Sequence, residues 1–183
     1  LLEYNADTPT TLLEAAILQW HWKTDVFPDD DQWNSLHERL VERWGEIRPR
    51  LTGEETHFTW SSADMTGEDN VTLAYMQECA AEAGLHTVAL AIEQLGYDSD
   101  LDRFVDLEEA PISSVFKLYP WEWVLDDEFG RRAVDLLPET MWVEPLWKTL
   151  LSNKAILAVL WEMYPGHPNL LPTYLDDPHE LTD

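Results

Sequence analysis

Cysteine, basic side chains and long hydrophobic runs are all scarce in this sequence. Cys79 is the single cysteine in 183 residues, which excludes an intrachain disulfide and a four-thiolate zinc site. Only 11 residues are Lys or Arg against 36 Asp or Glu, and the formal charge of −25 argues against binding to nucleic acids or anionic membranes. No apolar run approaches the ~20 residues of a membrane span. These absences favour a globular protein in a reducing, cytoplasmic setting.

The two ends of the sequence are unlike the ends of a natural domain. The chain opens at Leu1 with no Met, no basic region and no apolar signal sequence. Its first residues read like the end of a strand, which would need pairing partners that precede it. The last ten residues are rich in Asp, Pro and Glu, as in a linker. We therefore expect a piece of a longer polypeptide, with one α/β domain over residues 1–175 and an acidic tail over 176–183.

Hydrophobic periodicity predicts strands that alternate with helices along most of the chain. Strands that alternate with helices of ten or more residues favour βαβ units and a parallel sheet. The predicted fold class is therefore α/β, a three-layer sandwich with a mainly parallel central sheet and flanking helices. The predicted strands are 1–4, 56–60, 86–91, 104–107, 112–118 and 141–143, and the main predicted helices are 12–22, 32–48, 68–83, 119–137 and 153–163.

The first candidate for chemistry lies between the first predicted strand and the first predicted helix. Glu3 and Asn5 alternate with Tyr4, so both project from one side of an extended segment. A carboxylate and an amide there suit Mg²⁺, which prefers oxygen ligands. Thr8 and Thr10, with the free N–H groups of the helix start, suit an anionic ligand. The alternative interpretation is a turn and a helix cap without any ligand.

A second candidate is the acidic start of the predicted helix 68–83. Glu68 and Asp69 follow a loop that itself follows a predicted strand, so they lie where α/β sheets often bind ligands. Acidic residues in a first helical turn also stabilise the helix through its dipole. The two interpretations are therefore helix stabilisation and a binding site for a cationic amine.

The third candidate is Lys154, one of only four lysines. It precedes an otherwise apolar helical run, where the helix dipole disfavours a positive charge. A phosphate group would bind both the ammonium and the free N–H groups of the helix. The alternative is an exposed lysine that extends from the helix end into solvent.

Five motifs in this sequence resemble the glutathionylspermidine synthase family. More closely, the chain is similar to stand-alone synthetase-like members that lack the amidase half. The resemblance covers essentially the whole chain, and the motifs occur in the family's order. They are Glu-Tyr-Asn-Ala-Asp at 3–7, Phe-Lys-Leu-Tyr-Pro-Trp-Glu at 116–122, Glu-Pro-Leu-Trp at 144–147, Ser-Asn-Lys-Ala-Ile-Leu at 152–157 and Pro-Gly-His-Pro-Asn-Leu-Leu at 165–171.

The resemblance implies a Rossmann-like pre-ATP-grasp region of a carboxylate–amine ligase. Members of this family form an amide through an acyl-phosphate, with ATP and Mg²⁺ as cofactors. The resemblance implies that Glu3 and Asn5 are Mg²⁺ ligands and that Lys154 contacts the ATP phosphates. These roles are expectations that come from the family and not from the spacing of the residues.

The same resemblance implies substrate contacts and missing parts. Thr8 and Thr10 stand where the family has serines that contact a glutathione-type substrate, and Glu68-Asp69 stand where it has two glutamates near the peptide and polyamine. The family also has a strand before this region and an ATP-grasp module after it. We therefore expect the remaining parts of a synthetase as partners, and an inactive fragment without them. The alternative is a non-catalytic α/β interaction module.

The acidic excess predicts that salt stabilises the protein. Like charges at this density repel one another, and salt screens that repulsion. We expect the melting temperature to rise between ~0.05 and ~1 M NaCl in differential scanning calorimetry. An unchanged melting temperature over this range would contradict strong self-repulsion.

Overall fold

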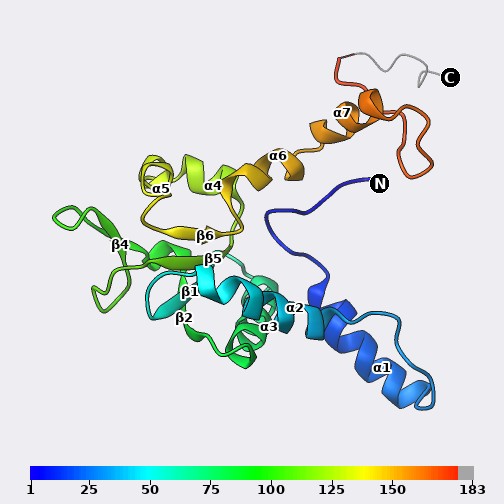
Figure 1. Ribbon diagram of the computed structural model, residues 1–183, viewed down its shortest axis with the longest axis horizontal. Helices are drawn as coiled ribbons and strands as arrows, with labels where there is room; N and C mark the ends of the chain where they lie inside the picture. The colour runs from blue at the N-terminus through cyan, green and yellow to red at the C-terminus, as the bar shows by residue number, and fades with distance from the viewer. Residues whose placement is uncertain (177–183) are drawn as a thin grey trace.

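The computed structural model describes residues 1–176 and has a four-stranded parallel sheet at its centre (Figure 1). The order of the strands is β2-β1-β5-β6. β1 (Glu55–Trp60) pairs along its whole length with β2 (His86–Ala91) and, on its other side, with β5 (Ser114–Leu118). β6 (Met141–Val143) pairs with the far side of β5. The predicted α/β class with a mainly parallel sheet is confirmed.

Helices cover both faces of this sheet, which gives the three layers. On one face, α2 (Leu36–Ile47) and α3 (Glu68–Glu82) pack through Trp44 and Leu73 against Phe58 and Phe116 of the sheet. On the other face, α4 (Trp121–Asp126) and α5 (Gly130–Asp135) enclose a second core with β5 and β6. In Figure 1, α4 and α5 lie above the sheet, and α2 and α3 lie at its lower right.

The alternation of side chains along β5 explains why both faces are covered. Phe116 and Leu118 belong to the core beneath α2 and α3, whereas Val115 belongs to the core beneath α4 and α5. All five residues of β5 are buried. Burial on both faces is expected for a strand of a parallel sheet, and β5 is apolar except for Ser114 and Lys117.

The remaining elements lie around these layers. A hairpin of β3 and β4 extends from the sheet, and two helical segments, α1 near the N-terminus and α7 near the C-terminus, project from the body (Figure 1). Their bounds are η1 Glu14–Leu18, α1 Gln19–Val26, η2 Arg48–Arg50, η3 Ile92–Gln94, β3 Gly96–Asp98, β4 Arg103–Val105, η4 Leu146–Lys148, α6 Thr149–Ser152 and α7 Ala155–Met163. No helix of the described residues is long and apolar enough to cross a membrane.

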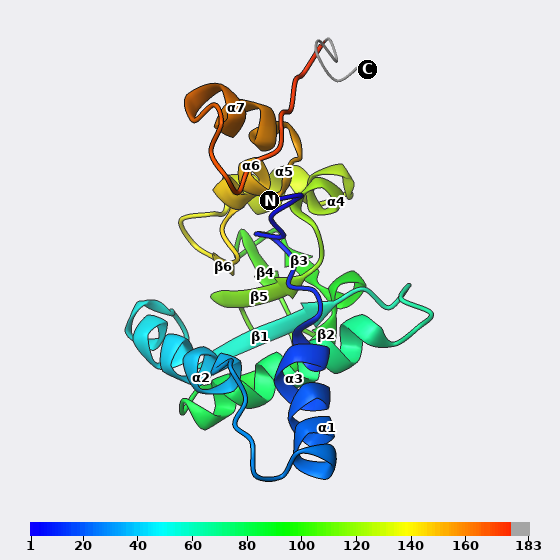
Figure 2. The ribbon, with the colours of Figure 1, turned by 90° about the vertical axis from the view of Figure 1, so that its right-hand side faces the viewer.

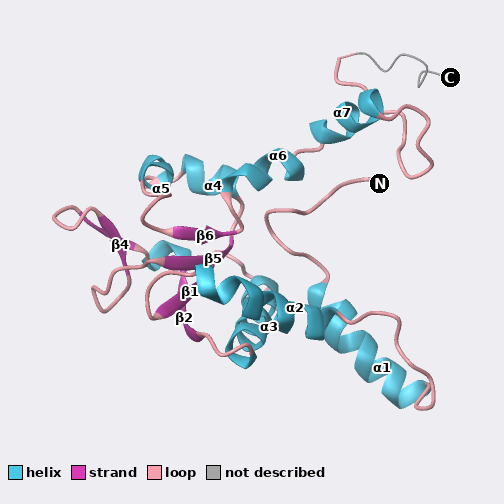
Figure 3. Ribbon diagram, viewed as in Figure 1, coloured by secondary structure: helices cyan, strands magenta, loops and turns pink. Residues whose placement is uncertain are grey.

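Two predicted elements were wrong. Residues 1–4 form no strand: they run as an extended loop outside the sheet, with Leu1 and Leu2 exposed (Figure 3). Apolar composition alone does not make a strand when no neighbouring strand pairs with it. The predicted helix 119–137 is two helices, α4 and α5, because the chain turns at residues 127–129. The predicted acidic tail lies outside the described residues from 177 onward.

Substitution of alanine for glycine should have opposite effects on stability at Gly130 and at Gly45. A Cβ at Gly130 would lie 2.4 Å from the Val124 carbonyl oxygen, whereas nothing lies within 4 Å of a Cβ at Gly45. Gly130→Ala should therefore lower the free energy of unfolding by about 1–3 kcal/mol. Gly45→Ala, inside α2, should raise it by about 0.5–1 kcal/mol. Urea unfolding measures both, and shifts of the same sign would contradict the packing described here.

Candidate functional site

The carboxyl ends of the four parallel strands meet at one edge of the sheet, which is where α/β proteins bind ligands. Ser61, Glu93, Tyr119 and Glu144 lie at or shortly beyond these strand ends. The N-terminal segment, residues 1–13, passes across this edge beside the end of β5 (Figure 2). Residues far apart in the sequence therefore meet here.

A buried ion pair holds the N-terminal segment in place. The Lys117 ammonium donates to the Asp7 carboxylate and to the Tyr119 carbonyl oxygen, 2.9 Å away, and lies 5.0 Å from the centre of the Trp121 ring. The backbone N–H of Trp121 donates to the second Asp7 oxygen at 2.6 Å. Lys117 and Asp7 are 0% and 2% exposed. Burial lowers the pKa of Lys117, and the Asp7 charge opposes that shift.

Glu3 and Lys154 form an ion pair although 150 residues separate them in the sequence. The Lys154 Nζ lies 3.0 Å from the Glu3 Oε2, and both side chains are largely exposed, at 74% and 46%. Lys154 is the N-cap residue of α7, as predicted, and the Asn153 side chain accepts from the Ala155 N–H at 2.9 Å. Because the pair is exposed, its charges remain accessible to a ligand.

Asn5 and Thr10 form a second contact within the N-terminal segment. The Asn5 Nδ2 donates to the Thr10 hydroxyl at 3.0 Å, which orients the amide and leaves its carbonyl oxygen free of that bond. Thr8 is half-buried and lies directly after Asp7. A free amide oxygen and the Glu3 carboxylate are hard oxygen ligands that fit Mg²⁺. The structure joins Glu3 to Lys154 and Asn5 to Thr10, and it forms no bond between Glu3 and Asn5.

Glu68 and Asp69 lie in the first turn of α3, as predicted, beyond the loop that follows β1. The Asp69 N–H donates to Asp64 at 2.9 Å, and Asp64 also accepts from Thr66. Burial, with the nearby charges of Asp64 and Glu68, raises the pKa of Asp69. These contacts account for the helix start, whereas Glu68 itself is exposed.

Glu93 is a residue of this edge that sequence reasoning missed. Its carboxylate accepts from the Ser61 hydroxyl at 2.7 Å and from the Ser62 N–H at 3.0 Å, and it thereby joins the ends of β2 and β1. Burial alone would raise the pKa of Glu93, but these donors outweigh it and hold the pKa below its ordinary value. A carboxylate two residues after a predicted strand is the signal that could have identified it.

A cavity of about 250 Å³ opens beside Glu93, between the ends of β2 and β5. Its lining combines acidic groups (Glu93, Asp127 and Glu128) with the aromatic rings of Tyr119 and Phe129. Carboxylates and aromatic faces both attract cations. The arrangement suits a ligand that carries an ammonium group.

Comparisons with known proteins identify the family of this chain. A family model described as glutathionylspermidine synthase preATP-grasp matches residues 1–183. A Haemophilus influenzae protein described as an acid–amine ligase is 43% identical over 183 residues, which are 99% of this chain and 46% of that protein.

Two further relatives are longer and more distant. The bifunctional glutathionylspermidine synthetase/amidase of Escherichia coli is 28% identical over 93% of this chain, and the trypanothione synthetase of Crithidia fasciculata is 27% identical over 99% of it. The chain covers 30% of each of these two proteins. It thus spans half or less of the length of the relatives it matches.

Removal of the Asp7 charge should cost far more stability than removal of the Glu3 charge. Asp7→Asn leaves a buried ammonium without its counter-charge and should lower the free energy of unfolding by about 3–5 kcal/mol. Glu3→Gln, the equivalent change in an exposed pair, should lower it by about 1 kcal/mol or less. Urea unfolding of the two variants makes the comparison, and equal losses would show that the Asp7–Lys117 pair is not the anchor.

Proposed function

We propose, because the chain belongs to the glutathionylspermidine synthase pre-ATP-grasp family, that it forms part of an ATP-dependent ligase. In this proposal the ligase joins a carboxylate to an amine as an amide, through an acyl-phosphate. The acid–amine ligase and the two synthetases described above support this reaction class. Since the chain spans half or less of each relative, the remaining parts of the synthetase are its proposed partners.

The observation that carries the proposal is the exposed ion pair that joins Glu3 of the N-terminal segment to Lys154 at the start of α7. In a solvent-facing pair of this kind, the carboxylate can bind a metal ion and the ammonium can bind a phosphate group. A metal–nucleotide complex presents both of these to the protein. A module without chemistry needs no such exposed pair, because the pair adds little to stability. The pair therefore favours the ligase over a non-catalytic interaction module.

Each residue of the candidate site has a proposed role. Glu3 and Asn5 offer oxygen ligands to Mg²⁺, and Lys154 offers an ammonium to the ATP phosphates. When bound, ATP supplies the phosphoryl group that activates the substrate carboxylate. Asn5 is oriented for this role by Thr10, and the whole segment is anchored by Asp7 on Lys117.

The substrate contacts belong to the same candidate site. We propose that the hydroxyl groups of Thr8 and Thr10 bind the acyl substrate. The resemblance to the family suggests that this substrate is a glutathione-type peptide. Glu68 and Asp69 stand at the start of α3 with negative charge that suits an amine substrate. The acidic and aromatic cavity beside Glu93 supports a cationic amine as well. Both substrates are small molecules.

The negative net charge of the chain affects its proposed binding of ATP. ATP carries about four negative charges and is repelled by a chain of charge −25 unless cations compensate. We propose that Mg²⁺ and the other parts of the synthetase supply that compensation, so that this chain alone is inactive. A reducing, cytoplasmic location stays a prediction from the single cysteine.

Lys154→Met tests the proposal. It should leave the free energy of unfolding within about 1 kcal/mol, because the Glu3 pair is exposed. With the remaining synthetase parts present, it should abolish most ATP hydrolysis coupled to amide formation. Thermal unfolding and a coupled turnover assay measure the two effects in parallel.

A matched control is Lys23→Met, which removes a lysine that stacks on Trp20 in α1, on a helix that projects from the body. This variant should keep wild-type turnover. Glu3→Gln should raise the Mg²⁺ concentration needed for half-maximal turnover. If Lys154→Met behaves like Lys23→Met, Lys154 is an ordinary surface lysine and the proposed site is wrong.

A further inference from the structure

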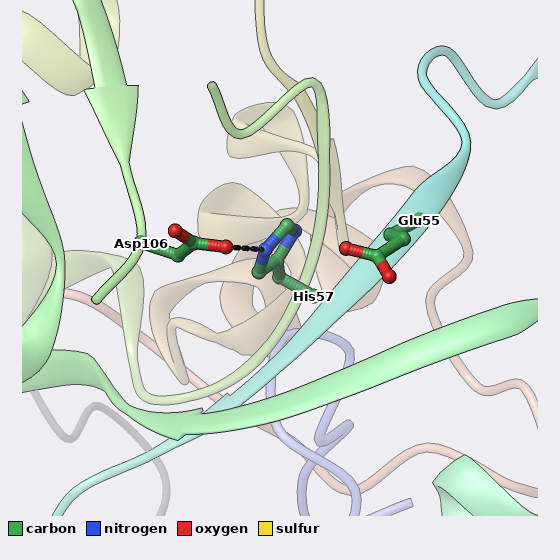
Figure 4. A group of neighbouring side chains, drawn as sticks. All are labelled: Glu55, His57 and Asp106. Atoms are coloured by element: carbon green, nitrogen blue, oxygen red, sulfur yellow. Dashed lines mark hydrogen bonds and ion pairs between the residues drawn. The ribbon is translucent and has the colours of Figure 1, made fainter. Parts of the chain in front are cut away.

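Three side chains with metal-ligating atoms gather on the other half of β1, away from the carboxyl edge. Glu55 and His57 are two residues apart on this strand, so their side chains share one face of the sheet. Asp106 follows β4 directly and reaches the same face. Figure 4 shows the His57 ring between the two carboxylates, with Asp106 on one side and Glu55 on the other. The candidate ligase site uses none of these residues.

The His57 ring is buried, and within the described part of the chain one of its two nitrogens has a hydrogen-bond partner. The residue is 2% exposed, and its Nε2 lies 3.2 Å from the Asp106 Oδ2. The Nδ1 is buried and makes no hydrogen bond to any of residues 1–176. Native proteins rarely leave a buried polar atom unpaired, so such an atom calls for an explanation. In the tautomer that donates its Nε2–H to Asp106, Nδ1 carries a lone pair.

Backbone hydrogen bonds orient the Asp106 carboxylate so that it accepts from the Nε2–H of His57, which fixes this tautomer of the ring. Its Oδ1 accepts from the backbone N–H groups of Glu108 and Ala110, both at 2.9 Å, which leaves Oδ2 for His57. These donors and His57 together hold the pKa of Asp106 below its ordinary value, although burial alone would raise it. A carboxylate that orients a histidine whose other nitrogen is free is the usual support of a metal-binding histidine.

Glu55 completes the cluster from the solvent side. It is exposed, and the ligand atoms of the three residues lie within 4.8 Å of one another. Two metal–ligand bonds of about 2.1 Å can bridge up to ~4.2 Å, so the ligand atoms have to approach one another when an ion binds. Glu55 is the exposed member of the cluster and faces solvent.

We propose that His57 Nδ1 and Glu55 bind a first-row divalent cation of the zinc class, with Asp106 as the positioning carboxylate behind His57. The imidazole nitrogen favours such a cation over Mg²⁺ or Ca²⁺, which prefer all-oxygen sites. The bound ion joins the Glu55 and His57 side chains of β1, and His57 in turn is hydrogen-bonded to Asp106 in the segment that connects β4 with β5. The site lies on the first half of β1, apart from the carboxyl ends of the strands.

Zinc titration of the protein tests this site. The protein is first treated with a chelator and then titrated with ZnCl₂ by calorimetry, in an excess of MgCl₂ that occupies hard-oxygen sites. We expect saturable binding of a single equivalent, and a rise in melting temperature with zinc, because an ion that binds only the folded state stabilises it. CoCl₂ in place of zinc should give visible absorption bands of a nitrogen-ligated site.

The variants locate the ion. Glu55→Gln should weaken zinc binding about tenfold or more, whereas Glu54→Gln, the same charge change one residue earlier, should leave it unchanged. Glu55→His should restore binding relative to Glu55→Gln, because imidazole is itself a zinc ligand. Asp106→Asn should weaken binding and shift the Co²⁺ bands, which loss of stability alone would not do.

Three results would overturn the proposal. The first is the absence of saturable zinc binding, which leaves His57 as a structural partner of Asp106. The second is wild-type binding by Glu55→Gln, which places the ion elsewhere. The third is equal weakening by Glu54→Gln and Glu55→Gln, which indicates diffuse attraction to an acidic surface.

Discussion

The buried ion pair of Asp7 and Lys117 is the interaction on which the arrangement of the candidate site depends. It joins the N-terminal segment to the end of β5, so the carboxyl edge of the sheet is covered by residues that precede every strand. Two charges out of water are costly unless each is paired and hydrogen-bonded, and the Trp121 N–H and the Tyr119 carbonyl meet that requirement. Glu3, Asn5, Thr8 and Thr10 owe their positions to this anchor.

Much of the fold was predictable because the sheet is parallel and buried. β1, β2, β5 and β6 coincide with predicted strands within two residues at each end, since segments rich in β-branched, aromatic and other apolar residues are readily recognised as strands. The strand predicted at 1–4 failed because pairing is a tertiary property that composition does not contain. β3 was missed because Gly96-Tyr-Asp98 has no apolar alternation, and it exists only because it pairs with β4.

The candidate site was predictable in part, and for two different reasons. The positions of Glu68, Asp69 and Lys154 at helix starts followed from local sequence pattern. That Glu3 meets Lys154 followed from no local pattern, because the contact spans 150 residues. Lys117 was not singled out as a buried charge because it lies within an apolar strand, and its partner Asp7 is 110 residues away. Such long-range polar contacts are visible only once the chain is folded.

The distance in sequence between Asp7 and Lys117 also has a consequence for how the chain is made. A ribosome adds roughly 5–20 residues per second, so Asp7 is synthesised several seconds before its partner, 110 residues later. During that interval the N-terminal segment has no place to dock, while β1, α3 and β2 can already assemble. The N-terminal segment is therefore among the last parts of this domain to reach its final position, although it is made before the strands on which it docks.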